Sequence, residues 1–538
     1  MPKRLFGLAF FSLVWLSASM GGAADLCNGL VQDKLPYPMT ALAKPGFRQT
    51  VVDPQFGTTI RRITHAAETG GPDAVIIPMY STMQAWNADE SYMILYDRTS
   101  GEGKHNLYDG KSYQFLQTLP IRSTDLEQVL WDPKDPDLLY YPSNYNAIPN
   151  LMSYRISTGA VSVVRNFQSA PTNCPAGNWG ILLSLGSDPQ YMSFGPAKVI
   201  GLQCGNTKFI YSIAANAILG VLNYNSPNAP VMAPSGGLAL FADSIFDYKL
   251  NYWYKLPLAD PYNHSNLGRS ASGHDTLNTV AFDDPPDQIG SLVTVDLWTG
   301  QKEVIVGPAT GYPYPPSTTH ISTTSVQNPG WAAVSIVGDP SGQTLLSQEL
   351  LLANTDTGQV CRIGHNRTYA GVVDGAKWGY WSEPHNVLSP SGTRVLFASD
   401  WSNGDSVDSY VVELPGYVND RVPPRVTGFF LIDKNTGERL LEIKNGDTVN
   451  LKPYAGRSLD IQTIVSPNLV TMMYHYVNRK SYSIDTTRPY TTDGAGNYMY
   501  PDRGPFVLGS NTLAAVALDD LGTVDGQYLS ITFYLVYQ

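Results

Sequence analysis

The sequence has few charged residues and little helical periodicity. Only 15% of its 538 residues are charged, and long stretches with helix-forming composition are missing. These features argue against a helical bundle, whose helices need apolar and charged residues on opposite faces. The chain is instead rich in Gly (48), Pro (39) and Tyr (33). This composition is typical of a turn-rich, all-β exported protein.

Several well-known enzyme motifs are also absent. The chain has no HExxH zinc helix, no phosphate-binding loop, no Rossmann glycine fingerprint and no GxSxG elbow. Peptidase activity is therefore not expected. The net charge of −11 makes nucleic acid and anionic membranes poor partners. An anionic substrate would need a local cation, either a bound metal or a few arginines.

The one long apolar run lies at the N-terminus. Lys3 and Arg4 precede the apolar stretch 5–16, and small residues follow before Asp25. This pattern predicts a signal peptide over residues 1–24. No later segment is apolar enough to span a bilayer, so we expect a soluble protein that is secreted or periplasmic.

Cysteine is scarce, and an even number remains after signal-peptide cleavage. The four are Cys27, Cys174, Cys204 and Cys361. In an exported chain an even number favours disulfides, with Cys174–Cys204 the expected pair. Cys27 and Cys361 would then join the N-terminus to a distant segment. Free buried thiols are the alternative, and no two cysteines have metal-ligand spacing.

A degenerate unit of short strands and turns recurs along most of the chain. Each unit has apolar strands separated by Asp/Ser/Gly/Pro turns and ends in a Tyr- or Leu-rich strand. The units begin near Gln84, Glu127, Trp179, Ala229, Gly273, His320 and Glu383. Seven units of roughly 45–60 residues predict a seven-bladed β-propeller with four strands per blade. The segment near Phe56 is expected to supply an outer strand that closes the ring.

The repeat ends near Pro423-Pro424, which marks a linker. We therefore expect the propeller over residues 25–421. Residues 422–538 alternate apolar and polar positions in short strands, which predicts a small immunoglobulin-like β-sandwich. The expected fold class is all-β.

Several unit starts carry polar side chains, which a propeller would bring to the mouth of its central channel. They are Gln84, Glu127, His274, His320, Glu383 and His385. Imidazole and carboxylate groups together can hold a divalent metal or transfer protons. A purely structural histidine that bonds a neighbouring loop is the alternative. Trp179 and Tyr380 could stack on sugar rings, although they could equally belong to the core.

The segments His320–Ser322, Glu383–His385 and "SPSGTRVLFASDW" resemble exported bacterial propellers of the TolB-like and oligogalacturonate-lyase-like group. Oligogalacturonate lyases are seven-bladed and hold a divalent cation, typically manganese, with histidines and a glutamine. The resemblance implies that His320 and His385 are metal ligands, completed by Glu383 or Gln84. It also implies that His274 lies where substrate binds. The lyase pattern has two closely spaced histidines in one blade, whereas this chain has Glu383 and His385.

These features predict a polysaccharide lyase that cleaves a uronic-acid glycan by β-elimination. A manganese or calcium ion, or an arginine, would neutralise the uronate carboxylate. His274 would accept the proton, and Glu383 is the second predicted catalytic residue. Gln84, Glu127, Trp179 and Tyr380 would contact the sugar chain. Hydrolysis would need two flanking carboxylates, for which Glu127 and Glu383 are the candidates, and a non-catalytic glycan- or protein-binding propeller is the alternative to an enzyme.

Overall fold

The computed structural model describes most of the chain after residue 24. The described residues are 25–71, 73–99, 103–123, 125–143, 145–175, 198–226, 228–262, 264–282, 290–313, 319–369, 375, 377–418, 425–466, 472–485, 490–492, 505–518 and 528–538. Within them the structure is almost entirely β, with one α-helix, α1 (Ala66–Gly70). The predicted signal peptide lies outside the described residues.

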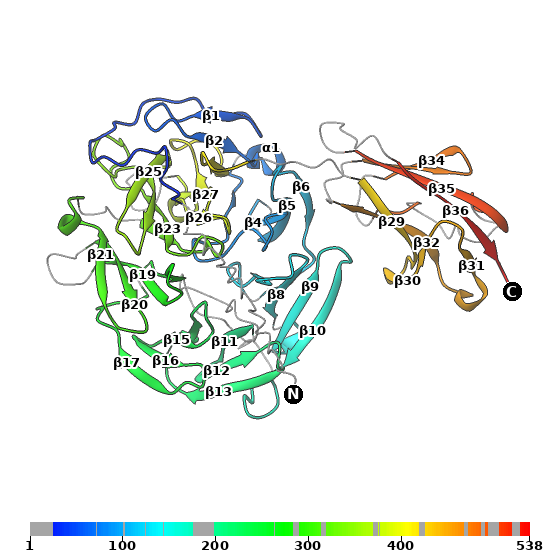
Figure 1. The fold of residues 1–538 in the computed structure, drawn as a ribbon, viewed down its shortest axis with the longest axis horizontal. Coiled ribbons are helices and arrows are strands. Elements are labelled where there is room, and N and C mark those ends of the chain that lie inside the picture. Colours follow the sequence, from blue (N-terminus) through cyan, green and yellow to red (C-terminus); the bar gives the residue numbers. More distant parts are fainter. Residues whose placement is uncertain are drawn as a thin grey trace, which may run out of the picture.

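The N-terminal part of the chain is a β-propeller, whose described strands form seven antiparallel sheets around a ring (Figure 1). The first blade contains β3 (Ile76–Ile77), β4 (Tyr92–Asp97), β5 (Lys104–Asp109) and β6 (Phe115–Thr118). The second contains β7 (Leu130–Trp131), β8 (Leu138–Ser143), β9 (Asn150–Arg155) and β10 (Ala160–Asn166). The third contains β11 (Val199–Cys204), β12 (Thr207–Ser212) and β13 (Ala217–Asn223).

The remaining blades continue the same order around the ring. The fourth contains β14 (Val231–Met232), β15 (Leu238–Phe241), β16 (Ser244–Asp247) and β17 (Tyr252–Lys255). The fifth contains β18 (Asn266–Arg269), β19 (Asp275–Ala281), β20 (Ser291–Asp296) and β21 (Lys302–Val306). The sixth contains β22 (Thr319–Ser322), β23 (Trp331–Ile336), β24 (Glu349–Asn354) and β25 (Val360–His365). The seventh contains β26 (Val387–Leu388), β27 (Arg394–Ser399) and β28 (Asp408–Glu413).

The two ends of the propeller sequence meet in the seventh blade. Strand β2 (Thr59–Arg62) pairs with β28, and β1 (Thr50–Val52) pairs with β2. This confirms the closing strand expected near Phe56. A disulfide between Cys27 and Cys361 attaches the N-terminal segment to β25. The predicted Cys174–Cys204 disulfide is also present.

Buried charge joins the last blade to the first. Arg394, at the start of β27, is fully buried, and its Nη2 lies 2.5 Å from Glu90 Oε2. The same guanidinium donates a hydrogen bond to the carbonyl of Gly110 and lies over the ring of Trp86. Such a pair stabilises only when its geometry is good and its other donors are bonded, as they largely are here.

The C-terminal part of the chain contains two further sheets that share one hydrophobic core. One sheet contains β29 (Arg425–Asp433), β30 (Glu438–Ile443) and β32 (Leu459–Ser466). The other contains β31 (Thr448–Asn450), β33 (Met472–Val477), β34 (Lys480–Asp485), β35 (Gly509–Leu518) and β36 (Leu529–Val536). From Asn511 onward, strand β35 alternates buried and half-buried residues, as expected when one face packs on a core. The immunoglobulin-like topology and the boundary at residues 421/422 remain predictions.

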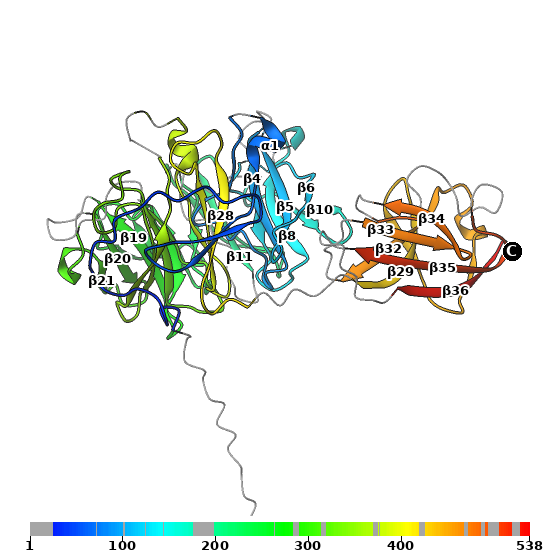
Figure 2. The same ribbon diagram turned by 90° about the horizontal axis from the view of Figure 1, so that it is seen from above.

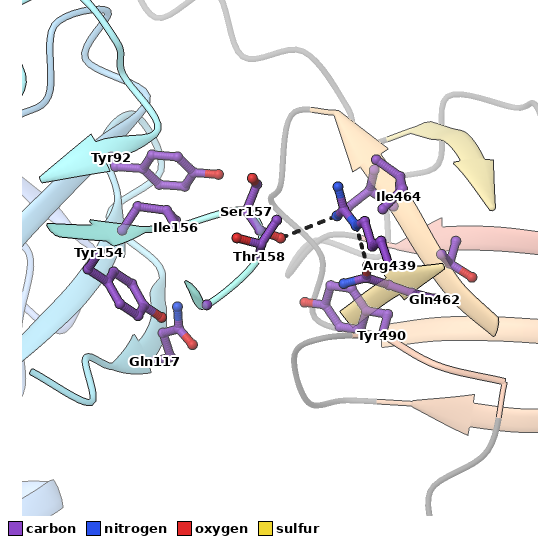
Figure 3. A pocket seen from close by; sticks show the side chains of 13 residues that line it. Tyr92, Gln117, Tyr154, Ile156, Ser157, Thr158, Arg439, Gln462, Ile464 and Tyr490 are labelled. Carbon is purple, nitrogen blue, oxygen red and sulfur yellow. Dashed lines mark hydrogen bonds between the residues drawn. The ribbon is translucent and has the colours of Figure 1, made fainter. Parts of the chain in front are cut away.

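The two parts lie side by side and approach each other near the second blade (Figures 1 and 2). A cavity of about 120 Å³ lies between them. Arg439 of β30 donates a hydrogen bond from Nη2 to the carbonyl of Ser157 across this junction, over 3.4 Å (Figure 3). No helix in the described ranges is long and apolar enough to cross a membrane.

Candidate functional site

Three side chains from two neighbouring blades meet where strands β22 (Thr319–Ser322) and β26 (Val387–Leu388) begin. His320 is the second residue of β22, while Glu383 and His385 lie between the short 3₁₀-helix η3 (Gly379–Ser382) and β26. His385 has φ of 39°, in the left-handed region that residues with a side chain seldom adopt. Backbone strain of this kind concentrates at functional sites.

The geometry of these three side chains fits a metal ion. Their ligand atoms all lie within 4.8 Å of one another. Glu383 Oε2 is 3.6 Å from His320 Nε2 and 3.5 Å from His385 Nε2. Both imidazoles are essentially inaccessible to solvent, at 1% and 0% exposure. Among the described residues, neither nitrogen of either ring has a hydrogen-bond partner.

Buried polar atoms without partners are costly, so this arrangement needs an explanation. Burial, with the nearby rings of His385 and His264, holds the pKa of His320 well below its usual value. The ring is therefore neutral at neutral pH, which is the protonation state that a metal ligand requires. Two imidazoles and one carboxylate are a donor set typical of divalent transition metals. The structure thus contains a site suited to a divalent cation.

A third histidine, His264, lies beside the cluster. Its ring centroid is 4.9 Å from that of His320, and its Nδ1 is buried without a hydrogen-bond partner in the described structure. Burial lowers its pKa, although the carboxylate of Glu383 opposes that shift. His264 was not singled out from the sequence, because the repeat unit assigned to the fifth blade starts at Gly273, about seven residues after the start of β18 at Asn266.

Two tyrosines complete the wall around the histidines. The ring of Tyr80 lies 5.1 Å from His385 and 5.5 Å from His320, and the ring of Tyr380 lies 4.6 Å from His385. Burial, followed by the negative charge of Glu127, raises the pKa of Tyr380 well above its usual value. Its hydroxyl is therefore protonated at neutral pH. Tyr380 therefore lies beside His385, and Glu127 is close enough to Tyr380 to act on it by its charge. Their contact with a sugar chain remains a prediction, and Tyr80 was not singled out from the sequence.

His274 does not lie with the other histidines, and its expected position at the start of an inner strand is wrong. The inner strand of the fifth blade is β18, which begins two residues after His264. His274 lies in the turn between β18 and β19, at the opposite end of that strand. Its ring is 46% exposed, and Nδ1 contacts Asp296 Oδ2 at 2.7 Å. The error arose because the turn "SASGHD" resembles the turn before a strand start.

Gln84 also lies away from the expected position. Its Nε2 donates hydrogen bonds to the carbonyls of Thr324 and Leu388, both beyond or at the far ends of their inner strands. Its Oε1 accepts a hydrogen bond from the backbone N–H of Trp86. Gln84 therefore ties three blades together rather than facing the histidines. The predicted sugar-stacking residue Trp179 lies outside the described residues.

A polar cavity of about 710 Å³ opens at the first blade, beside Tyr96 and His105. Lys104, Arg122 and Asp125 contribute charged groups to its lining. It adjoins the site through Tyr96, whose ring stacks on Trp381 with centroids 6.5 Å apart. The cavity lies on the same end of the blades as the histidine cluster, because β5 begins there and β6 ends there.

No protein-family model and no curated protein matches this chain. Among solved structures, it is similar to an oligogalacturonate lyase in complex with manganese, with 17% identity and a TM-score of 0.46. That alignment covers 70% of this chain and 99% of the lyase. It is also similar to an oligogalacturonate lyase from Vibrio parahaemolyticus, with 14% identity, a TM-score of 0.45, and coverage of 68% of this chain and 97% of that one. At these values, the chemistry of the site must be argued from the chain's own residues.

Proposed function

We propose that this protein is an exported, metal-dependent polysaccharide lyase that cleaves a uronic-acid-containing glycan by β-elimination. The observation that carries the proposal is the cluster of His320, Glu383 and His385, whose four ring nitrogens lack hydrogen-bond partners within the described structure. A structural histidine normally bonds at least one neighbour, so a purely structural role explains this cluster poorly.

The proposed ligands are His320 and His385 through imidazole nitrogen and Glu383 through a carboxylate oxygen. This set favours manganese or another transition metal over calcium, which takes oxygen ligands almost exclusively. When bound, such an ion neutralises a uronate carboxylate and so acidifies the proton on the adjacent carbon.

The chain's own residues would supply the proton transfers. His264 replaces His274 as the proposed proton acceptor, since it is neutral and lies at the edge of the cluster. Tyr380, which keeps its proton at neutral pH, would donate it to the departing glycosidic oxygen. Lys104 and Arg122 in the adjoining cavity would pair with carboxylates of further uronate units.

Metal content and lyase activity together test this function. The purified protein should bind about one Mn²⁺ per chain and release unsaturated uronate, followed by its ultraviolet absorbance, from polygalacturonate or another polyuronate. The H320A/H385A variant should lose both the metal and the activity. H65A is the matched control, because His65 stacks on Phe47, pairs with Glu68 and is not a member of the cluster.

Three results would each point elsewhere. Native protein that binds no divalent metal would contradict the proposed site. Metal binding and glycan binding without any product would favour a non-catalytic glycan-binding propeller. Release of saturated reducing ends would indicate hydrolysis, with Glu127 and Glu383 as the carboxylates to test.

A further inference from the structure

Two tryptophans from neighbouring blades form an exposed pair on the rim of the propeller. Trp253 of the fourth blade is 43% exposed, and Trp298 of the fifth blade is 44% exposed. Their ring centroids lie 5.6 Å apart with an interplanar angle of 74°. Large aromatic surface left in water is unfavourable, so a conspicuous exposed pair indicates a binding surface.

Specific local structure holds each ring in place. Strand β17 has a β-bulge at Trp253, because Ile245 pairs with Tyr254 and Phe246 pairs with Tyr252. A bulge redirects the side chain that it carries. Trp298 lies in a tight turn, where Asp296 Oδ1 accepts hydrogen bonds from the backbone N–H groups of Trp298 and Thr299.

Gly237 of the fourth blade leaves room for the ring of Trp298. The Trp298 indole lies over Gly237, where a Cβ atom would come within 3.9 Å of two ring carbons. At that distance a Cβ atom would make ordinary van der Waals contact with the indole, so Trp298 packs close to the backbone at Gly237. Both tryptophans are thus positioned by backbone features rather than by burial.

A polar cavity of about 400 Å³ continues this surface toward the sixth blade. Asp296 joins the two features, since it lines the cavity and also bonds the Trp298 backbone. The other polar lining residues are Ser270, Ser272, Thr276, Thr294, Gln301, Glu303, Thr355 and Asp356. Hydroxyl, amide and carboxylate groups at this density suit a ligand that carries many hydroxyls.

We propose that the Trp253–Trp298 pair and this cavity bind a neutral polysaccharide chain. Sugar rings present flat C–H faces to the indoles, and sugar hydroxyls donate to Asp296, Glu303 and Asp356. A polyuronate is the wrong ligand here, because these three carboxylates line the cavity and none of its described lining residues is a Lys or Arg. Among the described residues, the metal-ligating side chains that lie close enough together to hold an ion are those of the histidine cluster. The described lining of this cavity therefore contains no preformed cation site.

This surface lies at the opposite end of the blades from the proposed lyase site. In the fifth blade, His264 precedes β18, whereas Asp296 pairs with Thr276 and Thr276 pairs with Gly268 near the end of β18. The two sites can therefore be occupied at once. The Trp253–Trp298 pair and its cavity would bind the protein to a neutral glycan, while the proposed lyase site would cleave a different polymer.

Native gels cast with soluble polysaccharides test the proposal. Native protein should be retarded by at least one of hydroxyethyl cellulose, galactan and arabinoxylan. W253A/W298A should lose that retardation, with an apparent affinity about tenfold or more weaker, because two aromatic contacts are removed. The Y528A variant removes an aromatic side chain that is 66% exposed on the sandwich and should migrate like the native protein.

A second readout separates binding from folding. Soluble oligosaccharides of the retarding polymer should change the tryptophan fluorescence of the native protein, and W253F/W298F should abolish that change. The melting temperature should move little, since both rings are substantially exposed. Free migration of the native protein in every neutral gel would overturn the proposal, and so would retardation that survives in W253A/W298A. Loss of retardation by polygalacturonate in the same variant would overturn the choice of a neutral ligand.

Discussion

His475 illustrates how a single buried residue can control the pH response of the C-terminal sheets. Its ring is fully buried, with Nε2 at 2.8 Å from Thr463 Oγ1 and Nδ1 at 3.1 Å from Ser483 Oγ. Ser483 donates its own hydroxyl proton to the carbonyl of Thr492, so it accepts from Nδ1–H. Nε2 is then the acceptor of the Thr463 hydroxyl proton. A second ring proton would disrupt this arrangement.

Burial lowers the pKa of His475 to about 4 from 6.5. In the unfolded chain, His475 therefore binds a proton as the pH falls below 6.5, whereas in the folded chain it does so only near pH 4. We predict that the sandwich loses up to about 3 kcal/mol of stability as the pH falls through this window. In calorimetry, the unfolding transition of the sandwich should occur at a lower temperature at pH 4.5 than at pH 7.5.

The H475Q variant is the control, because glutamine does not titrate in this range. It should be less stable than the native protein at neutral pH but should lack most of the pH dependence of the sandwich transition between these two values. An unchanged pH dependence in H475Q would show that other groups are responsible.

At the scale of elements, ring closure depends on a short strand pairing and one long-range covalent bond. Strand β2 contributes four residues to the seventh blade, while Cys27–Cys361 links positions 334 residues apart. Cys174–Cys204 closes a loop with a sequence separation of only 30. In the chain-entropy model, the longer loop stabilises the fold more.

We therefore predict that C27S/C361S destabilises the propeller by about 2–5 kcal/mol, roughly 2 kcal/mol more than C174S/C204S. Urea unfolding of the two double variants, followed by tryptophan fluorescence, measures the difference. Equal or reversed losses would mean that strain or residual structure in the unfolded chain outweighs loop entropy.

The positions of some site residues relative to their strands could be predicted from the sequence, and those of others could not. His320 and His385 could be predicted from the sequence, because each lies close to the start of an inner strand that is marked by a clear turn or apolar run. His264 was missed and His274 was chosen instead, because two similar turns border β18 and periodicity cannot say which end of a strand faces the channel mouth. The predicted position of Gln84 was wrong for the same reason, since the inner strand of the first blade begins at Ile76. Tyr80 carries no polar signal that distinguishes it from a core tyrosine.

At the scale of the whole molecule, the two parts meet around the cavity that Arg439 lines. Arg439 is partly buried there, and its Nε donates to Gln462 Oε1 at 2.7 Å while Nη2 reaches the carbonyl of Ser157. Its guanidinium also lies over the ring of Phe430, 4.8 Å from the centroid. Burial lowers the pKa of Arg439, but it remains charged at neutral pH. Figure 3 shows Arg439 and Tyr490 facing Ser157 and Thr158 across the cavity.

Replacing Arg439 by alanine should loosen this junction without unfolding either part, because each part has its own hydrophobic core. A hydrogen bond from a charged group to a carbonyl contributes about 1.5–3 kcal/mol at most, and less at 3.4 Å. Separated arrangements should then become several-fold more populated. Small-angle X-ray scattering should show a larger radius of gyration for R439A than for the native protein. K444A is the matched control, since Lys444 pairs with Glu442 on the sandwich surface. Superimposable scattering curves for R439A and native protein would mean that other contacts hold the two parts together.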